Sequence, residues 1–180
     1  MKKNIVLTAS IILFFASSIL LAQNKSDNVK TLAQSLRSHK NIEVSFTYQT
    51  ISDASQPVEE KEGKAYFQGE TYKFILEDQH AISDGKTKWQ YIIEEEEVMV
   101  GNTTDDDNPI KILDELEKDS SAIKTTIDKK GNLKGLEVEI DEGVKLILNI
   151  TEMKFDQEFE EGFFTFNAKD YPDVEIIDMR

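Results

Sequence analysis

Side chains alternate between apolar and polar at every second position through much of this sequence, and this period constrains the fold more than any other feature. From residue 42 to residue 49, Ile, Val, Phe and Tyr at the even positions alternate with Glu, Ser, Thr and Gln at the odd ones. Successive side chains of a β-strand point to opposite faces of a sheet, so the pattern predicts a strand with one buried and one solvated face. Similar short segments follow, separated by turn residues such as Gly69 and Asp84-Gly85.

Ten or so strands are predicted in this way, together with two short amphipathic helices. We expect the strands at about 42–49, 63–68, 71–77, 80–83, 86–93, 97–100, 122–128, 133–141, 144–150, 153–159, 162–166 and 174–178. Asp27 can cap the first helix, and Pro109 suits the first turn of the second. The short connections favour an antiparallel meander, and so many strands exceed one flat sheet. We therefore expect a mainly β (α+β) fold, in which a curled antiparallel sheet bends toward a barrel.

The beginning of the chain has the features of an export signal. Two lysines lie within the first four residues, and an apolar run then extends to Ala22 before the chain turns polar. This predicts a cleavable signal peptide over residues 1–22. An uncleaved membrane anchor is the alternative, although the run is short for a membrane-spanning helix. No linker or repeat divides the remainder, so we expect one exported domain over residues 23–180.

The charge of the chain limits its partners. The formal net charge is −14 at pH 7, and removal of the two lysines of the signal peptide makes it more negative still. Nucleic acid is therefore not an expected partner, because phosphate binding needs concentrated Lys and Arg. The sequence has no cysteine, so an exported chain of this kind depends on packing instead of disulfides. We expect a soluble monomer.

Groups for catalysis or metal binding are scarce. His39 and His80 are far apart in sequence and have no cysteine near them, so no familiar zinc-ligand spacing exists. Residues 105–107 are three aspartates without the alternating ligands of a calcium loop, and we expect this charge run to be solvated. There is no Gly-x-Ser-x-Gly and no phosphate-binding glycine loop. We therefore expect no enzymatic activity, no catalytic residue, no cofactor and no metal.

The apolar positions of the predicted strands are expected to form one apolar face, opposite a largely polar one. They are Phe46, Tyr48, Phe67, Tyr72, Phe74, Leu76, Trp89, Tyr91, Leu136, Val138, Ile140, Leu146, Leu148, Phe155, Phe164 and Phe166. Two modest helices would cover only part of so wide a face, which leaves room for a hydrophobic pocket. The alternative is that the same side chains pack against one another as an ordinary core. Periodicity alone does not distinguish these two arrangements.

Several motifs resemble those of one protein family. The segment Ile82–Tyr91, with the sequence ISDGKTKWQY, resembles a hallmark of the LolA family of periplasmic lipoprotein carriers, in which an S-D-G-K turn leads into a W-x-Y strand. Further matches, in chain order, are the N-terminal helix and the strand at 44–49, the glycine-led hairpin at 63–67 and 72–74, Asn108-Pro109 at the start of a mid-chain helix, and the closing strands at 164–167 and 174–178. The resemblance covers nearly the whole chain after the signal peptide.

The resemblance implies both a fold and a function. It implies an unclosed β-barrel whose apolar concave face, covered by helices, takes up lipoprotein acyl chains in the periplasm. Such carriers receive their cargo from an inner-membrane lipoprotein-releasing ABC transporter and pass it to an outer-membrane acceptor. Burial of an acyl chain of about 16 carbons gains roughly 12 kcal/mol, which a soluble carrier must match in large part. The lipid-binding residues expected here are Phe46, Tyr48, Phe67, Phe74, Trp89, Tyr91, Ile112, Leu116, Val138, Leu146, Leu148 and Phe155.

One turn departs from the family pattern. Well-known members have an arginine-proline pair after the glycine-led strand, and the arginine holds the helical lid closed, whereas this chain has Gly69-Glu70. The departure therefore leaves three alternatives: a different latch, an open cavity or a different lipid cargo. A LolA-like binding module or sensor for another lipid or a protein is a second hypothesis. An esterase acting on lipid tails is a third, and the sequence offers no clear nucleophile and base for it.

Overall fold

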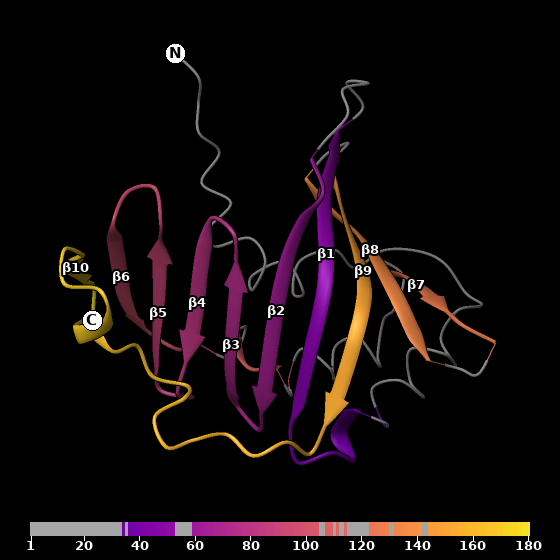
Figure 1. Cartoon of the computed structure of the whole chain (residues 1–180), viewed down its shortest axis with the longest axis horizontal. Helices are drawn as coiled ribbons and strands as arrows, with labels where there is room; N and C mark the ends of the chain where they lie inside the picture. Colours follow the sequence, from indigo (N-terminus) through magenta and orange to yellow (C-terminus); the bar gives the residue numbers. More distant parts are fainter. Residues whose placement is uncertain are drawn as a thin grey trace.

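The computed structural model describes residues 34, 36–52, 59–104, 107–109, 111, 114, 123–129, 132–141 and 144–180. Within them, ten strands form one sheet in the order β10-β6-β5-β4-β3-β2-β1-β9-β8-β7 (Figure 1). The strands are β1 (Ile42–Ser52), β2 (Lys61–Gln68), β3 (Thr71–Leu76), β4 (Gln79–Ser83), β5 (Thr87–Ile92), β6 (Glu97–Asn102), β7 (Ile123–Ile127), β8 (Leu133–Asp141), β9 (Val144–Phe155) and β10 (Glu175–Asp178).

The sheet is built from two runs of neighbouring antiparallel strands. Strands β1 to β6 follow one another as a meander, and β7 to β9 form a second run that joins the first where β9 pairs with β1. Strands β7 and β10 lie at the two edges, so the sheet does not close on itself. The prediction of one large, mainly antiparallel and unclosed sheet is therefore confirmed. The predicted helices lie largely outside the described residues, as does the signal peptide.

Three predicted strands differ from the structure. The strand predicted at 144–150 and the first part of the one predicted at 153–159 form one strand, β9, which has a bulge where the pairing with β1 shifts between Ser45 and Phe46. Residues 156–159 are not in a strand. The strand predicted at 162–166 is wrong, because turns replace it: the amide of Phe163 donates to the carbonyl of Glu160, and the amide of Thr165 donates to that of Gly162.

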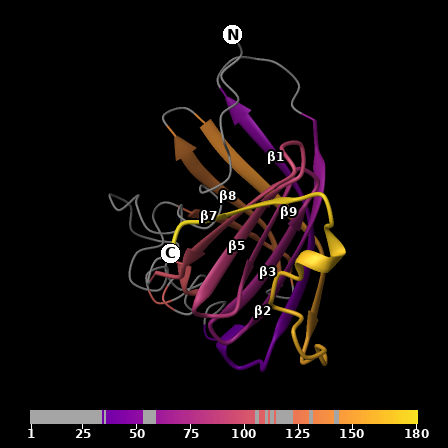
Figure 2. The same cartoon turned by 90° about the vertical axis from the view of Figure 1, so that its left-hand side faces the viewer.

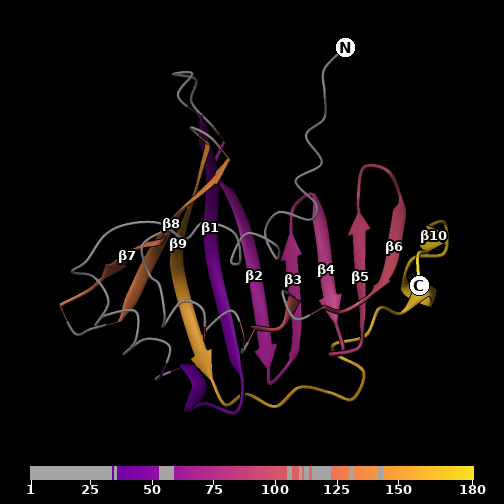
Figure 3. The ribbon, with the colours of Figure 1, turned by 180° about the vertical axis from the view of Figure 1, so that it is seen from behind.

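Strand β10 is parallel to its neighbour β6, where an antiparallel meander was expected. The chain leaves β9 and runs along the sheet before it reaches the far edge, so it arrives in the same direction as β6 (Figures 1 and 3). A short 3₁₀ turn, η2 (Ala168–Asp170), lies in this segment. In the part of the chain that the structure describes, no helix has the length and apolar character to cross a membrane.

The strand register divides the side chains between two faces. We call the face that carries Phe46, Ala65 and Leu76 the core face, because these buried side chains belong to one hydrophobic cluster. Residues 157–174, which we call the C-terminal segment, pack against the opposite face, where the rings of Phe159 and Phe163 meet that of Tyr66 edge-on. From the side, this segment lies along one face of the sheet, whereas β7 and β8 turn toward the other side (Figure 2).

Candidate functional site

The core face of β1, β2, β3, β8 and β9 carries a hydrophobic cluster. Its buried cluster consists of Phe46, Tyr48, Ala65, Leu76, Val138 and Leu146. Half-buried side chains pack against this cluster, namely Val44, Phe67, Phe74, Leu136, Val144 and Leu148. Seven of the twelve predicted lipid-binding residues thus lie together, four of them inside the cluster and three beside it. The half-buried three, Phe67, Phe74 and Leu148, are the better placed to contact a ligand.

The glycine at the start of the hairpin motif makes room for this cluster. A Cβ atom at Gly63 would lie 2.6 Å from Cε2 of Phe46 and 2.8 Å from Cδ2 of Leu76, closer than carbon atoms approach one another. The ring of Phe46 therefore lies directly over the Gly63 backbone, which is its neighbour across the β1–β2 pair. In this position glycine is required by packing, and lipid binding is not needed to explain it.

Trp89 and Tyr91 do not share the face of Phe46, and the sequence prediction of one common apolar face is wrong for them. Trp89 pairs with Ile82, which in turn pairs with Lys73, so these three side chains lie opposite to Phe74. Tyr91 pairs with His80 on that same opposite face. The apolar positions change face across the β3–β4 turn and stay on that face across the β4–β5 turn, and a pattern within one strand does not reveal this.

The opposite face has its own aromatic contacts around Tyr91. Its ring lies 4.9 Å from the ring of Tyr171 in the C-terminal segment, and the Tyr171 ring stacks on Phe166 at 5.0 Å. The hydroxyl of Tyr171 lies 3.4 Å from Nδ1 of His80. These contacts fix the C-terminal segment on the sheet, so Tyr91 has a structural partner within the chain. Phe164 and Phe166, also expected on the common apolar face, belong to this segment.

The remaining predicted residues lie elsewhere. Phe155, at the end of β9, pairs with Ile42 on the core face, and its ring stacks on that of His39 with centroids 4.0 Å apart. It therefore marks the end of the core face, away from the buried cluster. Ile112 and Leu116 lie outside the residues whose side chains the structure describes, so the structure does not test their predicted role.

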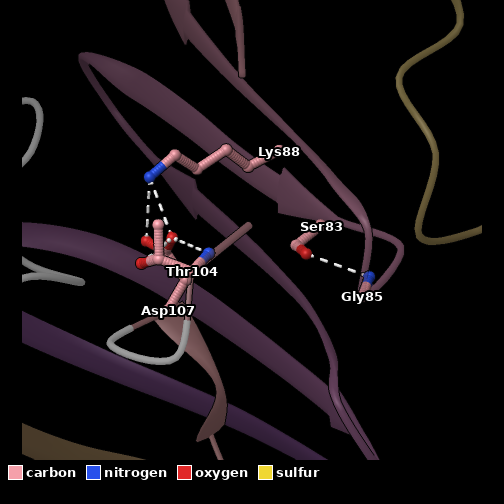
Figure 4. Close-up of polar contacts among 5 residues, drawn as sticks. All are labelled: Ser83, Gly85, Lys88, Thr104 and Asp107. Carbon is pink, nitrogen blue, oxygen red and sulfur yellow. Dashed lines mark hydrogen bonds and ion pairs between the residues drawn. The ribbon is translucent and has the colours of Figure 1, made fainter. Parts of the chain in front are cut away.

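The Ser-Asp-Gly-Lys motif forms the β4–β5 turn. The Asp84 carboxylate accepts hydrogen bonds from the amides of Lys86 and Thr87, at 2.9 and 2.7 Å. Ser83 Oγ accepts from the amide of Gly85 at 3.1 Å (Figure 4), and Gly85 has a φ of 88°, which favours glycine. Each residue of the turn thus has a local reason to be present. The motif that carries the family resemblance is explained by turn geometry.

Lys88, five positions after Ser83, forms a partly buried ion pair that was not predicted from the sequence. Its Nζ atom lies 2.9 and 3.1 Å from the two carboxylate oxygens of Asp107, which is only 2% exposed. The backbone amide and the hydroxyl of Thr104 also donate to Asp107, each at 2.8 Å (Figure 4). Asp107 was expected to be solvated as part of a charge run, and this expectation is wrong. The sequence contains no signal for this ion pair, because Lys88 is at a polar position of the alternating strand pattern.

This ion pair gives the core face a polar end. Lys88 pairs across the sheet with Ser83, which pairs with Tyr72, so the three side chains share the core face. Gln79 and Gln90 lie on the same face of β4 and β5, and their side chains are hydrogen-bonded at 3.3 Å. The core face is therefore apolar over β1 to β3, β8 and β9, and polar over β4 and β5.

Solved structures share this fold. A crystal structure of an uncharacterized conserved protein from Thermus thermophilus is similar with a TM-score of 0.52 and 10% identity, over 86% of this chain and 99% of that one. The LolA superfamily protein NE2245 from Nitrosomonas europaea is similar with a TM-score of 0.48 and 9% identity, over 80% of this chain and 99% of that one.

A third similar structure is a putative outer membrane lipoprotein-sorting protein domain from Vibrio parahaemolyticus, with a TM-score of 0.43 and 11% identity, over 78% of this chain and 97% of that one. At such low identity the likeness concerns the fold and assigns no role to any residue. No protein-family model and no curated protein sequence matches the chain.

The described part of the chain contains no clear site for catalysis or metal binding. Those residues contain no group of three acidic or histidine side chains that could hold a metal ion. His80 is half-buried among aromatic rings, and burial, assisted by the charge of Lys73, lowers its pKa.

Proposed function

We propose that this protein is a periplasmic chaperone that binds the acyl chains of lipoproteins on its core face and carries them from the inner to the outer membrane. The proposal rests on one observation above all: half-buried apolar side chains from five strands surround a buried cluster on one face of an unclosed sheet. The ordered series of family-like motifs behind a signal-peptide-like N-terminus supports the periplasmic location and the type of cargo. The carrier acts without an enzymatic step.

Its partners under this proposal are an inner-membrane lipoprotein-releasing ABC transporter and an outer-membrane acceptor. The strongly acidic chain is repelled by anionic lipid headgroups, which favours release from the membrane surface once an acyl chain is bound. A single acyl chain of about 16 carbons gains roughly 12 kcal/mol on leaving water, so the half-buried apolar side chains must supply much of the carrier's affinity.

A LolA-like binding module or sensor for another lipid or a protein is the second candidate. It is favoured by the β2–β3 turn, where Glu70 stands in place of the family's arginine-proline pair. Here Oε1 of Glu70 accepts a hydrogen bond from Nδ2 of Asn108 at 2.9 Å. An acidic residue in this turn makes different contacts from a cationic one, so the arginine latch of the well-known carriers is not carried over to this chain.

The carrier function is tested by what the protein holds and what it can keep in solution. The protein is purified from periplasm without detergent, and an organic extract is analysed by mass spectrometry, followed by a solubilisation assay with a triacylated lipoprotein. We expect acylated material in the extract and soluble complexes in the assay. A protein that is empty and also fails to solubilise the lipoprotein contradicts the proposal. Another bound lipid without lipoprotein binding favours the second candidate.

Two adjacent residues of β9 provide a matched pair of variants. Leu148 lies on the core face beside the buried cluster, whereas Ile147 is half-buried on the opposite face. Leu148→Glu is expected to reduce lipoprotein binding at least tenfold, because a carboxylate on the apolar face must be desolvated when an acyl chain binds. Ile147→Glu is expected to leave binding unchanged. Circular dichroism establishes that both variants fold. Equal binding by the two variants would place the ligand off the core face.

A further inference from the structure

Two buried side-chain atoms lack a hydrogen-bond partner among the described residues: Oδ1 of Asn41 and the hydroxyl of Tyr72. Asn41 lies just before β1, and its side-chain amide donates to the carbonyl of Gln157, so this residue fastens the start of the C-terminal segment. Tyr72 lies in β3 on the core face and is only 1% exposed. A buried hydroxyl without a well-formed hydrogen bond is unfavourable, and although the Ser83 hydroxyl lies near it, the Tyr72 hydroxyl can still donate to an acceptor.

Tyr72 lies on the border between the two parts of the core face. On one side its strand neighbour is Phe67, which packs against the buried cluster, and its own ring meets that of Phe74 with centroids 5.6 Å apart. On the other side its strand neighbour is Ser83. Ser83 in turn pairs with Lys88, which forms the ion pair with Asp107. An acylated molecule also has an apolar part followed by a polar one, because its hydrocarbon chain ends at a polar carbonyl linkage.

The charges around Tyr72 indicate which acceptor suits it. Burial, and next the charge of Asp107, raise its pKa, although the Ser83 hydroxyl lowers it, so Tyr72 remains a neutral donor. Lys88 is paired with Asp107, and the two charges compensate each other. Because Lys88 is already paired, a ligand carboxylate at this place would lie near the negative charge of Asp107 and would have no cation to pair with. A neutral carbonyl oxygen avoids this repulsion.

We propose that the Tyr72 hydroxyl donates a hydrogen bond to the ester or amide carbonyl of an acyl chain that lies along Phe67 and Phe74. The site thus recognises acyl chains in their esterified or amide-linked form and discriminates against free fatty acids and against plain alkyl chains. This inference rests on the proposed function, since it names a polar contact within the same apolar site.

Two lipids that differ in one carbonyl test this directly. Palmitoyl lysophosphatidylcholine carries its chain through an ester, and hexadecyl lysophosphatidylcholine carries the matched chain through an ether. Binding of each to the wild-type protein and to Tyr72→Phe is measured by calorimetry below the micellar concentration. The wild type is expected to bind the ester about fivefold more tightly than the ether, equivalent to about 1 kcal/mol for one hydrogen bond. In Tyr72→Phe the two lipids are expected to bind equally, with the ether at wild-type affinity.

The possible outcomes separate this inference from the proposed function. Equal affinity of the wild type for ester and ether overturns the role of Tyr72 and leaves acyl-chain binding intact. A preference for the ester that persists in Tyr72→Phe also overturns it, because the donor then lies elsewhere. Failure of the wild type to bind either lipid contradicts the proposed function, and the inference with it. The comparison of the two lipids on the wild type does not depend on the folding of a variant.

Discussion

The two halves of the sheet use the same alternating sequence pattern in opposite ways. In β1 to β3, β8 and β9 the large apolar side chains lie on the core face, where Phe46 and Leu76 form part of the buried cluster. In β4 to β6, Ile82, Trp89 and Val100 lie on the opposite face, and the core face carries a partly buried ion pair. The difference shows that one sheet can present a continuous surface that is apolar at one side and polar at the other.

The first prediction tests whether the core face dominates stability. Phe46→Ala is expected to reduce the free energy of unfolding by about 3–5 kcal/mol, because it removes a buried ring from the cluster. Phe163→Ala removes a half-buried ring of the C-terminal segment and is expected to cost only about 1 kcal/mol. Urea unfolding followed by circular dichroism measures both. Equal losses would mean that the opposite face is as much a core as the core face.

The polar end of the core face is tested by its ion pair. Asp107→Ala is expected to cost about 2–3 kcal/mol, since it leaves the ammonium of Lys88 and the amide of Thr104 without their acceptor. Lys88→Met is expected to cost less, because Asp107 keeps both hydrogen bonds from Thr104. Thermal and urea unfolding give the two values. A larger loss for Lys88→Met would show that the lysine, and not the aspartate, anchors the loop after β6.

The border between the two halves is tested by Tyr72→Phe in the absence of lipid. Removal of the unpartnered hydroxyl is expected to raise the free energy of unfolding of the empty protein by about 1 kcal/mol. Tyr48→Phe is a control, because the Tyr48 hydroxyl lies 3.5 Å from Oδ1 of Asp78 at a part-buried position, and its removal is not expected to stabilise the protein. Destabilisation by Tyr72→Phe would indicate that the hydroxyl already has a partner in the free protein.

The smallest expected effect concerns pH and the opposite face. The pKa of His80 is lowered by burial and by Lys73, so the folded protein binds this proton less readily than the unfolded chain does. The free energy of unfolding should therefore fall as the pH decreases through about 6.5, the ordinary histidine value, by less than about 1 kcal/mol. Urea unfolding of the wild type and of His80→Phe at about pH 7.5 and 5.5 isolates this contribution. Identical pH dependence in the two proteins would assign the titration to other groups.

The sequence was sufficient to predict most of the strands, because period-two alternation and turn residues are local features, whereas the unclosed sheet was implied by the family resemblance. The face on which Trp89 lies was not predictable in the same way. It depends on the register across the turns at Glu77-Asp78 and Asp84–Lys86, and a shift of one residue there exchanges the two faces. The segment Ser83–Lys88 was correctly located as a turn followed by the start of a strand. Its side chains make hydrogen bonds to the turn backbone and an ion pair, and none of them has an apolar role.

The candidate site was predicted only in part for a related reason. Phe67, Phe74 and Leu148 could be selected because apolar alternation marks a buried side of each strand. Asp107 could not, because its burial depends on Lys88 approaching from another strand. Nor could the Tyr72 hydroxyl be singled out, since the absence of a partner is a property of the folded surroundings. The burial of Asp107 and the surroundings of the Tyr72 hydroxyl depend on contacts between residues that are far apart in sequence, and composition does not show such contacts.

The return of the chain to β6 has a consequence for the order in which the molecule folds. Strand β10 pairs with β6 although the two are far apart in sequence, so this pairing closes a large loop and is entropically slow. The hairpins between β2 and β6 have short connections and can form first. Until the last residues arrive, the hydrogen-bonding edge of β6, with Val98 and Val100 beside it, stays available to other chains. The final strand thus covers the edge of β6 only late in folding.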